Sequence, residues 1–258
     1  MKNIIIITGA SSGFGEQFAL KLDSKLKSID EYWLIARNTE KMEEIAKAMS
    51  TPCRILSYDL LKEESVKEII KCVEMEADDC YDELYIKMLV NSAGYGKIGN
   101  FASSDDEDVC GMIDINIRAL TMLTKGLIPY MADNSRIINI ASSAAFLPQP
   151  GFAEYAATKS YVLSFSRALN AELSKYGISV TAVCPGPAAT NFFNIAEEKT
   201  KILRIKKYFM ADPKKVVDKA IHDSINKYEL SVYSMPMKAL HVAAKFVPHH
   251  FIMKFYKV

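Results

Sequence analysis

The chemistry that this sequence could perform centres on Tyr155 and Lys159, which stand four positions apart in a predicted helix. Residues at this spacing project from the same helix face. A free tyrosine has a pKa of about 10 and is a poor acid or base near neutrality, whereas a nearby cation favours its phenolate. We therefore expect Lys159 to lower the pKa of Tyr155, so that the tyrosine can act as a general acid or base.

Ser142 lies thirteen residues before Tyr155, at the predicted end of a strand. Its hydroxyl could hold a substrate carbonyl oxygen beside the phenol. Ser143 is the alternative for this role. A Tyr-x-x-x-Lys pair on a helix is usually only a surface pair, so the assignment depends on the other motifs of the chain.

A glycine-rich segment follows the first predicted strand and opens a helix, as a loop that cradles phosphates requires. Glycines allow a tight turn and a close approach to a pyrophosphate, and the helix N-terminus offers free N–H groups. The spacing is GxxxGxG, and a tight turn without a ligand is the alternative interpretation. The candidate cofactor-binding residues here are Gly9, Ser11, Ser12, Gly13, Phe14 and Gly15.

The end of the second predicted strand bears on the choice of cofactor. An acidic residue there would bind the ribose 2′-hydroxyl of NAD, whereas an arginine favours a 2′-phosphate. The sequence has Arg37 and Asn38 at this position and no carboxylate. NADP(H) is therefore favoured over NAD(H), although an exposed arginine at a strand end is the simpler alternative.

These motifs occur in a recognisable order along the chain. With Asn91-Ser92-Ala93-Gly94, Asn116, Ser142, Tyr155 to Lys159 and Pro185-Gly186, the sequence resembles the classical short-chain dehydrogenase/reductase (SDR) family over residues 3 to about 190. Ser92 departs from the family pattern, which usually has Asn there.

The resemblance implies roles for further residues. Lys159 would also hydrogen-bond the nicotinamide ribose, Asn116 would support a water-linked proton path to it, and Ser142 is favoured over Ser143. It also implies a homo-oligomer, a dimer or a tetramer, built on the long helices. The remaining implied cofactor-binding residues are Asp59 and Leu60, Asn91, Ala93 and Gly94, and Pro185, Gly186 and Thr190.

Apolar β-branched runs alternate with longer amphipathic stretches, which indicates strands buried on both faces and covered by helices. We predict an α/β fold, a single doubly wound Rossmann domain over residues 1–258 with a mainly seven-stranded parallel sheet and helices on both faces. Strands are expected near 3–8, 31–36, 52–57, 86–91, 135–141, 178–184 and 229–233. Helices are expected near 13–27, 39–50, 62–78, 106–131, 155–176 and 213–227.

The composition excludes several classes of protein. The 258 residues include 32 Lys or Arg and 31 Asp or Glu, a balance that gives no global field to attract nucleic acid. Five scattered cysteines with no CxxC pair indicate reduced thiols, and no metal site is expected. No run is long enough for a membrane span or a signal peptide, so we expect a soluble cytoplasmic protein.

Two segments fit the alternation of strands and helices least well. Residues 187–211 would form an apolar lid over a hydrophobic substrate, with an ordinary packed helix as an equal alternative. Residues 235–258 contain four lysines and no acidic residue. This segment could contact a membrane, although most such tails simply complete the fold.

The leading hypothesis is an NADP(H)-dependent oxidoreductase that interconverts a ketone or aldehyde and an alcohol, with Tyr155 as general acid/base. The alternative is a regulatory or scaffold protein that binds a dinucleotide without catalysis. Such a protein would be expected to lose Ser142, Tyr155 or Lys159, and all three are present.

Overall fold

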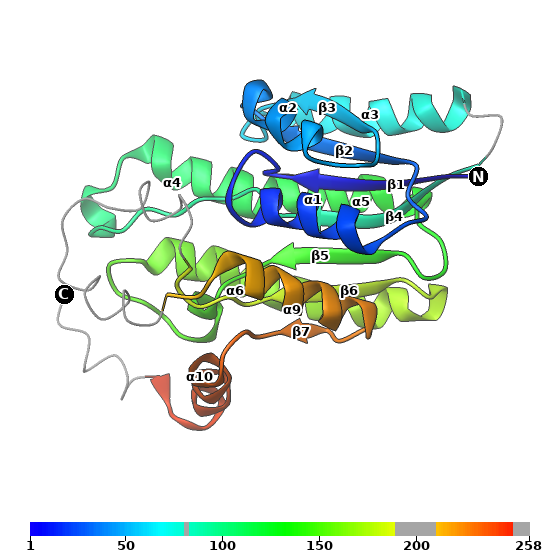
Figure 1. Ribbon diagram of the computed structural model, residues 1–258. Coiled ribbons are helices and arrows are strands. Elements are labelled where there is room, and N and C mark those ends of the chain that lie inside the picture. The colour runs from blue at the N-terminus through cyan, green and yellow to red at the C-terminus, as the bar shows by residue number, and fades with distance from the viewer. Residues whose placement is uncertain (80–82, 189–209, 250–258) are drawn as a thin grey trace.

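Four consecutive isoleucines, Ile4 to Ile7, form the centre of the protein in strand β1 (Lys2–Thr8), and all four are fully buried. Because successive side chains of a strand point to opposite faces, this run requires apolar cover on both sides of the sheet. A computed structural model describes residues 1–79, 83–188 and 210–249, and in it helices cover both faces of the sheet that contains β1 (Figure 1).

The described strands form one parallel sheet with the order β3-β2-β1-β4-β5-β6-β7, which confirms the predicted doubly wound Rossmann fold. The order reverses beside β1, and ligands of such sheets bind at this reversal, outside the carboxyl ends of the strands. The other strands are β2 (Glu31–Ala36), β3 (Cys53–Ser57), β4 (Leu84–Asn91), β5 (Arg136–Ile140), β6 (Ser179–Val183) and β7 (Leu230–Ser231).

Two helical layers enclose the sheet. The first layer packs on the face that carries Ile5 and Ile7, and consists of α1 (Gly13–Lys25), α2 (Thr39–Lys47) and α9 (Pro213–Ile225). The second packs on the face that carries Ile4 and Ile6, and consists of α3 (Glu63–Asp79), α5 (Leu120–Leu127) and α6 (Ala153–Leu173). Helices α4 (Asp106–Ile113) and α10 (Met235–Phe246) lie outside these layers, together with short 3-10 turns at Phe101–Ser103, Ile128–Tyr130, Ser143–Phe146 and Ser174–Tyr176.

The predicted helix 106–131 has an interruption that the sequence did not reveal. A π-helical segment, Asp114–Ala119, joins α4 to α5 and contains Asn116. Segments of this kind are frequent at functional sites. The prediction of a single regular helix was wrong at this point.

Helix α10 was not predicted either. It lies in the segment 235–258, which follows the last predicted strand and fits the alternation of strands and helices poorly. Of the predicted lid at 187–211, residues 189–209 and with them Thr190 lie outside the described residues. Ala188 and Ala211, which lie on either side of residues 189–209, form an isolated parallel bridge.

Candidate active site

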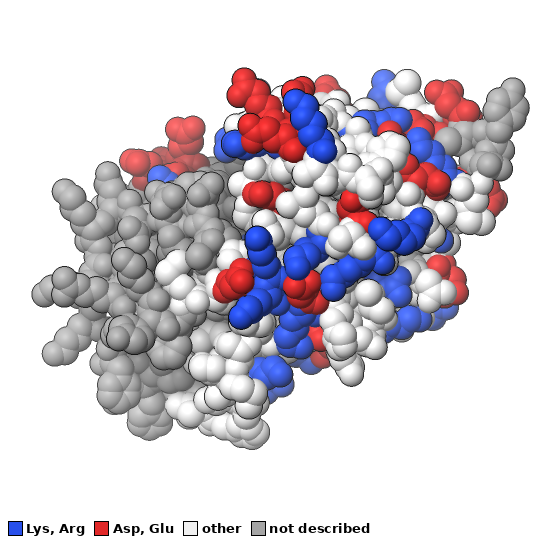
Figure 2. Space-filling model, in the orientation of Figure 1, with Lys and Arg blue, Asp and Glu red and all other residues white. Residues whose placement is uncertain are grey.

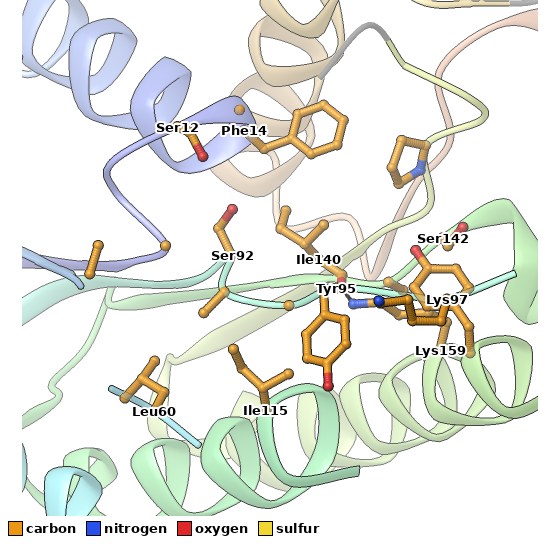
Figure 3. A pocket seen from close by; sticks show the side chains of 18 of the residues that line it. Ser12, Phe14, Leu60, Ser92, Tyr95, Lys97, Ile115, Ile140, Ser142 and Lys159 are labelled. Carbon is orange, nitrogen blue, oxygen red and sulfur yellow. Dashed lines mark hydrogen bonds between the residues drawn. The ribbon is translucent and has the colours of Figure 1, made fainter. Parts of the chain in front are cut away.

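A cavity of about 560 Å³ opens at the carboxyl ends of the central strands. It is lined by most of the residues that the sequence singled out (Figure 3). In that view Ser12 and Phe14 lie at one end of the cavity, Ser142 and Lys159 lie at another, and Tyr95 stands in the middle. The predicted residues that line it are Gly9, Ser11, Ser12, Gly13, Phe14, Arg37, Asn38, Asp59, Leu60, Ala93, Gly94, Ser142, Tyr155, Lys159, Pro185 and Gly186.

Three predicted residues, Gly15, Asn91 and Asn116, do not line the cavity. Gly15 is required by packing, because a Cβ there would collide with the carbonyl oxygen of Gly9. Asn91 is buried beneath the loop that follows β4, where its amide nitrogen donates to Thr124 Oγ1 and Asn139 Oδ1 at 3.0 and 2.9 Å. Gly15 and Asn91 therefore support the loops of the site without lining the cavity.

The glycine-rich loop approaches the β4 loop so closely that only glycine fits. Gly9 has a φ of +65°, and a Cβ there would lie 2.9 Å from the nitrogen of Ala93. Gly13 also has a positive φ, +59°, where α1 begins. The two glycines carry the chain in a tight turn along the cavity into α1, whose first turn has free N–H groups, an arrangement suited to a pyrophosphate.

Thr8, which the sequence analysis did not single out, holds the two loops together. Its buried Oγ1 accepts hydrogen bonds from the backbone nitrogens of Ser92 and Ala93, each at 3.1 Å. The sequence contained a usable signal for this role. Thr8 is a hydroxyl residue at the end of β1, directly before the glycine turn, where its side chain can reach the end of a neighbouring strand. Thr8 is a positioning residue for the loop that lines the cavity.

Helix α6 brings Tyr155 and Lys159 to the cavity on one face, as their spacing predicted. The ammonium nitrogen of Lys159 lies 5.7 Å from the centroid of the Tyr155 ring and donates to the carbonyl oxygen of Ile140 at 2.9 Å. Ser142 begins the turn after β5, hydrogen-bonds the Tyr155 hydroxyl, and accepts from Ala144 N at 3.1 Å. The described geometry thus pairs Ser142 with the tyrosine.

Burial determines the protonation states of Tyr155 and Lys159. It raises the pKa of the Tyr155 hydroxyl above its ordinary value, with the hydrogen bond to Ser142 opposing the shift, and lowers the pKa of Lys159 to about 8. Both side chains are more than nine-tenths buried, and removal of water disfavours each charged form. The net shift of the tyrosine pKa is therefore upward, the reverse of the expected lowering, because burial outweighs the effect of a nearby cation. The phenol keeps its proton and is set to donate it.

The side chain of Asn116 is fully engaged. Its Nδ2 donates to the Tyr95 carbonyl at 2.9 Å and to Thr158 Oγ1 at 3.1 Å, and its Oδ1 accepts from Tyr95 N at 3.2 Å. A Cβ on Gly94 would lie 2.5 Å from Asn116 Oδ1 and 3.4 Å from Lys159 Nζ. Asn116 therefore fixes the backbone of Gly94 and Tyr95 beside the lysine.

The opposite end of the cavity lies at the ends of β2 and β3. Arg37 is exposed and lines the cavity, and Asn38 caps α2 by accepting a hydrogen bond from Lys41 N at 2.9 Å. Asp59 also lines the cavity, and its Oδ1 accepts from Leu61 N at 3.2 Å. A cation and a helix N-terminus thus lie together at the end of β2, with no carboxylate at the position that follows the strand.

Two aromatic side chains accompany Tyr155 in the lining. Phe152 stacks on the Tyr155 ring with centroids 4.3 Å apart, and Tyr95 packs against the same buried cluster. At the rim Lys97 pairs with Asp108 at 3.2 Å.

The described residues hold no group of three histidine, cysteine or acidic side chains placed to bind a metal ion. Among the described helices, none combines the length and the apolar character that crossing a membrane requires.

The chain is similar to known members of one protein family. The family model for short chain dehydrogenases matches residues 3–201. An uncharacterized oxidoreductase of Staphylococcus epidermidis is 32% identical over 192 residues, which cover 73% of this chain and 79% of the relative. Sulfoacetaldehyde reductase 2 of Chromohalobacter salexigens is 32% identical over 201 residues, which cover 74% of this chain and 75% of that protein.

Solved structures share this fold. A short-chain dehydrogenase from Sphingobium yanoikuyae in complex with NADPH superposes with a TM-score of 0.77 at 25% identity, covering 99% of this chain and 96% of that one. Another neighbour of the same fold, a reductase from Brucella melitensis, is complexed with NADH.

Proposed function

The chain belongs to the short-chain dehydrogenase family, and from this premise and the geometry of its cavity we propose that it is an NADP(H)-dependent oxidoreductase that interconverts a carbonyl compound and an alcohol. The observation that carries the proposal is the meeting of Ser142, Tyr155 and Lys159 in the cavity that also contains the glycine-rich loop.

The residues of the cavity fit a nicotinamide dinucleotide. The turn at Gly9 leaves no room for a side chain, and it leads into the N-terminus of α1. When bound, the cofactor supplies the hydride for the substrate carbon. We assign the adenine end to Asp59 and Leu60, and the nicotinamide end to Lys159, Pro185 and Gly186.

Tyr155 would donate its proton to the substrate oxygen in the reductive direction, since burial keeps the hydroxyl protonated. Ser142 would hold that oxygen beside the phenol. Lys159, still largely charged at neutral pH with a pKa of about 8, would stabilise the phenolate left after transfer. Asn116 keeps the neighbouring backbone in place, and we assign it the support of a water-linked proton path to the lysine.

The preference for NADP(H) is supported by Arg37 and the N-terminus of α2. A guanidinium and a helix N-terminus both attract a phosphate, and no carboxylate follows β2 to accept the 2′-hydroxyl of NAD. Asn38 lines the cavity and its side chain caps α2, so we propose that it contributes to cofactor binding mainly by fixing this end of the site.

The substrate is proposed to be hydrophobic, because Phe152 and Tyr95 line the cavity and pack with Tyr155 in one buried cluster. We also propose a homo-oligomer built on the helices around α4, α5 and α6. Large apolar side chains are exposed there, Ile113 at 45%, Met122 at 41% and Tyr161 at 37%. The four described cysteines are free thiols, which supports a reducing compartment such as the cytoplasm.

A panel of aldehydes, ketones and alcohols, assayed by NADPH absorbance in both directions, tests the proposed function. The wild-type protein is expected to turn over at least one carbonyl substrate, and Ser142→Ala to lose most of that rate. A protein that binds NADPH tightly and turns over no substrate in the panel would instead support the alternative, a regulator or scaffold without catalysis.

A further inference from the structure

Helix α10 is apolar on the side that faces the protein and also on the side that faces away. Its inner residues Met237, Leu240 and Ala244 pack on the small cluster around Phe146. Its outer residues Met235, Val242 and Phe246 are 75%, 54% and 79% exposed. An isolated exposed apolar residue needs no explanation, but an aligned set indicates a partner surface.

The outer residues form one continuous line. Met235, Ala239, Val242 and Phe246 recur at intervals of four, three and four, which places them along a single helical stripe. All four are exposed. In Figure 2, residues other than Lys, Arg, Asp and Glu cover much of the described lower edge, where Figure 1 places α10 beyond β7.

The charges beside this line are of one sign. Lys238 and Lys245 are seven residues apart, exposed, and lie along one border of the stripe. The helix contains no acidic residue, and neither does the rest of the sequence from 235 to 258. A second copy of α10 would bring two more lysines and no carboxylate to meet them. The surface of an anionic bilayer matches both the apolar stripe and the lysines. Its acyl region accepts the stripe, and its headgroups accept the lysines.

We propose that α10 is an interfacial helix that docks this protein on the surface of an anionic membrane. The helix would lie parallel to the bilayer with Val242 and Phe246 inserted at the headgroup boundary. The inference is independent of the proposed activity, because it depends only on the described exposure and charge of α10.

The inner face of α10 connects this surface to the candidate active site. A Cβ on Gly186, which lines the cavity, would lie 3.0 Å from Met237 Cγ, and His241 stacks against Phe146 with ring centroids 4.6 Å apart. Docking through α10 would therefore hold the cavity close to the bilayer, where hydrophobic carbonyl compounds collect.

Co-sedimentation of the full chain with vesicles tests the proposal. We expect binding to vesicles of equal parts phosphatidylcholine and phosphatidylglycerol at low salt, little binding to pure phosphatidylcholine, and release near 1 M salt, where the Debye length falls to about 3 Å. Each lysine near an anionic leaflet contributes roughly a fivefold factor, so Lys238→Glu with Lys245→Glu should weaken binding by at least about 25-fold.

A second variant tests the apolar stripe. Val242→Ser with Phe246→Ser changes two exposed side chains and should also abolish most vesicle binding. Matched controls lie near the opposite edge of the sheet. Lys47→Glu with Lys71→Glu makes the same change in net charge on α2 and α3, and Met75→Ser removes a 56% exposed apolar side chain. The controls should bind vesicles as the wild type does.

Absence of wild-type binding to the anionic vesicles at low salt would overturn the proposal. So would equal losses in the α10 variants and the controls. If the Val242/Phe246 variant changed the molar mass in light scattering while vesicle binding was absent throughout, the stripe would be a contact between copies of the chain, and the membrane proposal would be wrong.

Discussion

Replacing Lys159 with methionine is expected to make the folded protein more stable while it destroys turnover. Lys159 is 5% exposed, and its one described hydrogen bond is to the Ile140 carbonyl. Burial lowers its pKa to about 8 from the usual 10.5. The charged lysine is thus held at a cost to stability, as expected of a side chain kept for function.

The magnitude follows from linkage. A lowered folded-state pKa on a cation means that the unfolded chain binds more protons between about pH 8 and 10.5, so stability is lowest below pH 8 and rises above it. The shift of about 2.5 pKa units corresponds to roughly 3 kcal/mol at pH 7. Leaving the Ile140 carbonyl without its donor offsets about 1 kcal/mol, so Lys159→Met should gain about 2 kcal/mol.

Urea unfolding of the cofactor-free protein, followed by circular dichroism, measures this gain. Between about pH 7 and pH 9.5 the wild type should recover about 2 kcal/mol relative to Lys159→Met, because its lysine becomes neutral in the folded state. The exposed Lys125→Met serves as the matched control. A gap between wild type and Lys159→Met that stays constant with pH, or a less stable variant at pH 7, would refute the reasoning.

Three further perturbations probe other parts of the site. Arg37→Asp should reduce the preference for NADPH over NADH by about tenfold to a hundredfold, since a charge-assisted phosphate contact contributes ~1.5 to 3 kcal/mol; equal affinities of the wild type for the two cofactors, measured by titration, would contradict the assignment. Thr8→Val should weaken cofactor binding severalfold, because the nitrogens of Ser92 and Ala93 lose their acceptor; an unchanged Kd would show that the loop does not need this support. Light scattering at micromolar concentration should show at least a dimer, and Met122→Glu should dissociate it; a monomeric wild type would rule out the proposed interface.

Much of the site follows from the sequence because parallel strands end at one edge of the sheet. The glycine-rich loop, Ser142 and Pro185 each follow a predicted strand, so their convergence in one cavity required only the order of motifs. Tyr155 and Lys159 share a helix face by spacing alone. These features are local, and local patterns predict them well.

Features that depend on packing were not predictable. The sequence did not show that Asn116 sits in a π-helical segment with its amide held by Tyr95, because that bond joins residues twenty-one positions apart. The raised pKa of Tyr155 depends on its burial, which the lysine spacing does not report. Helix α10 was missed because it lies beyond the last predicted strand, in a segment that fits the alternation of strands and helices poorly.

The central claim is that Tyr155 supplies the proton, and Tyr155→Phe tests it most directly when turnover and NADPH binding are measured on the same preparation. Only the hydroxyl is lost, and the ring can keep its stacking on Phe152. We predict that carbonyl reduction falls by about 100-fold to 10,000-fold, the usual contribution of a general acid, while the Kd for NADPH changes little. A variant that kept a tenth or more of the wild-type rate would contradict the claim.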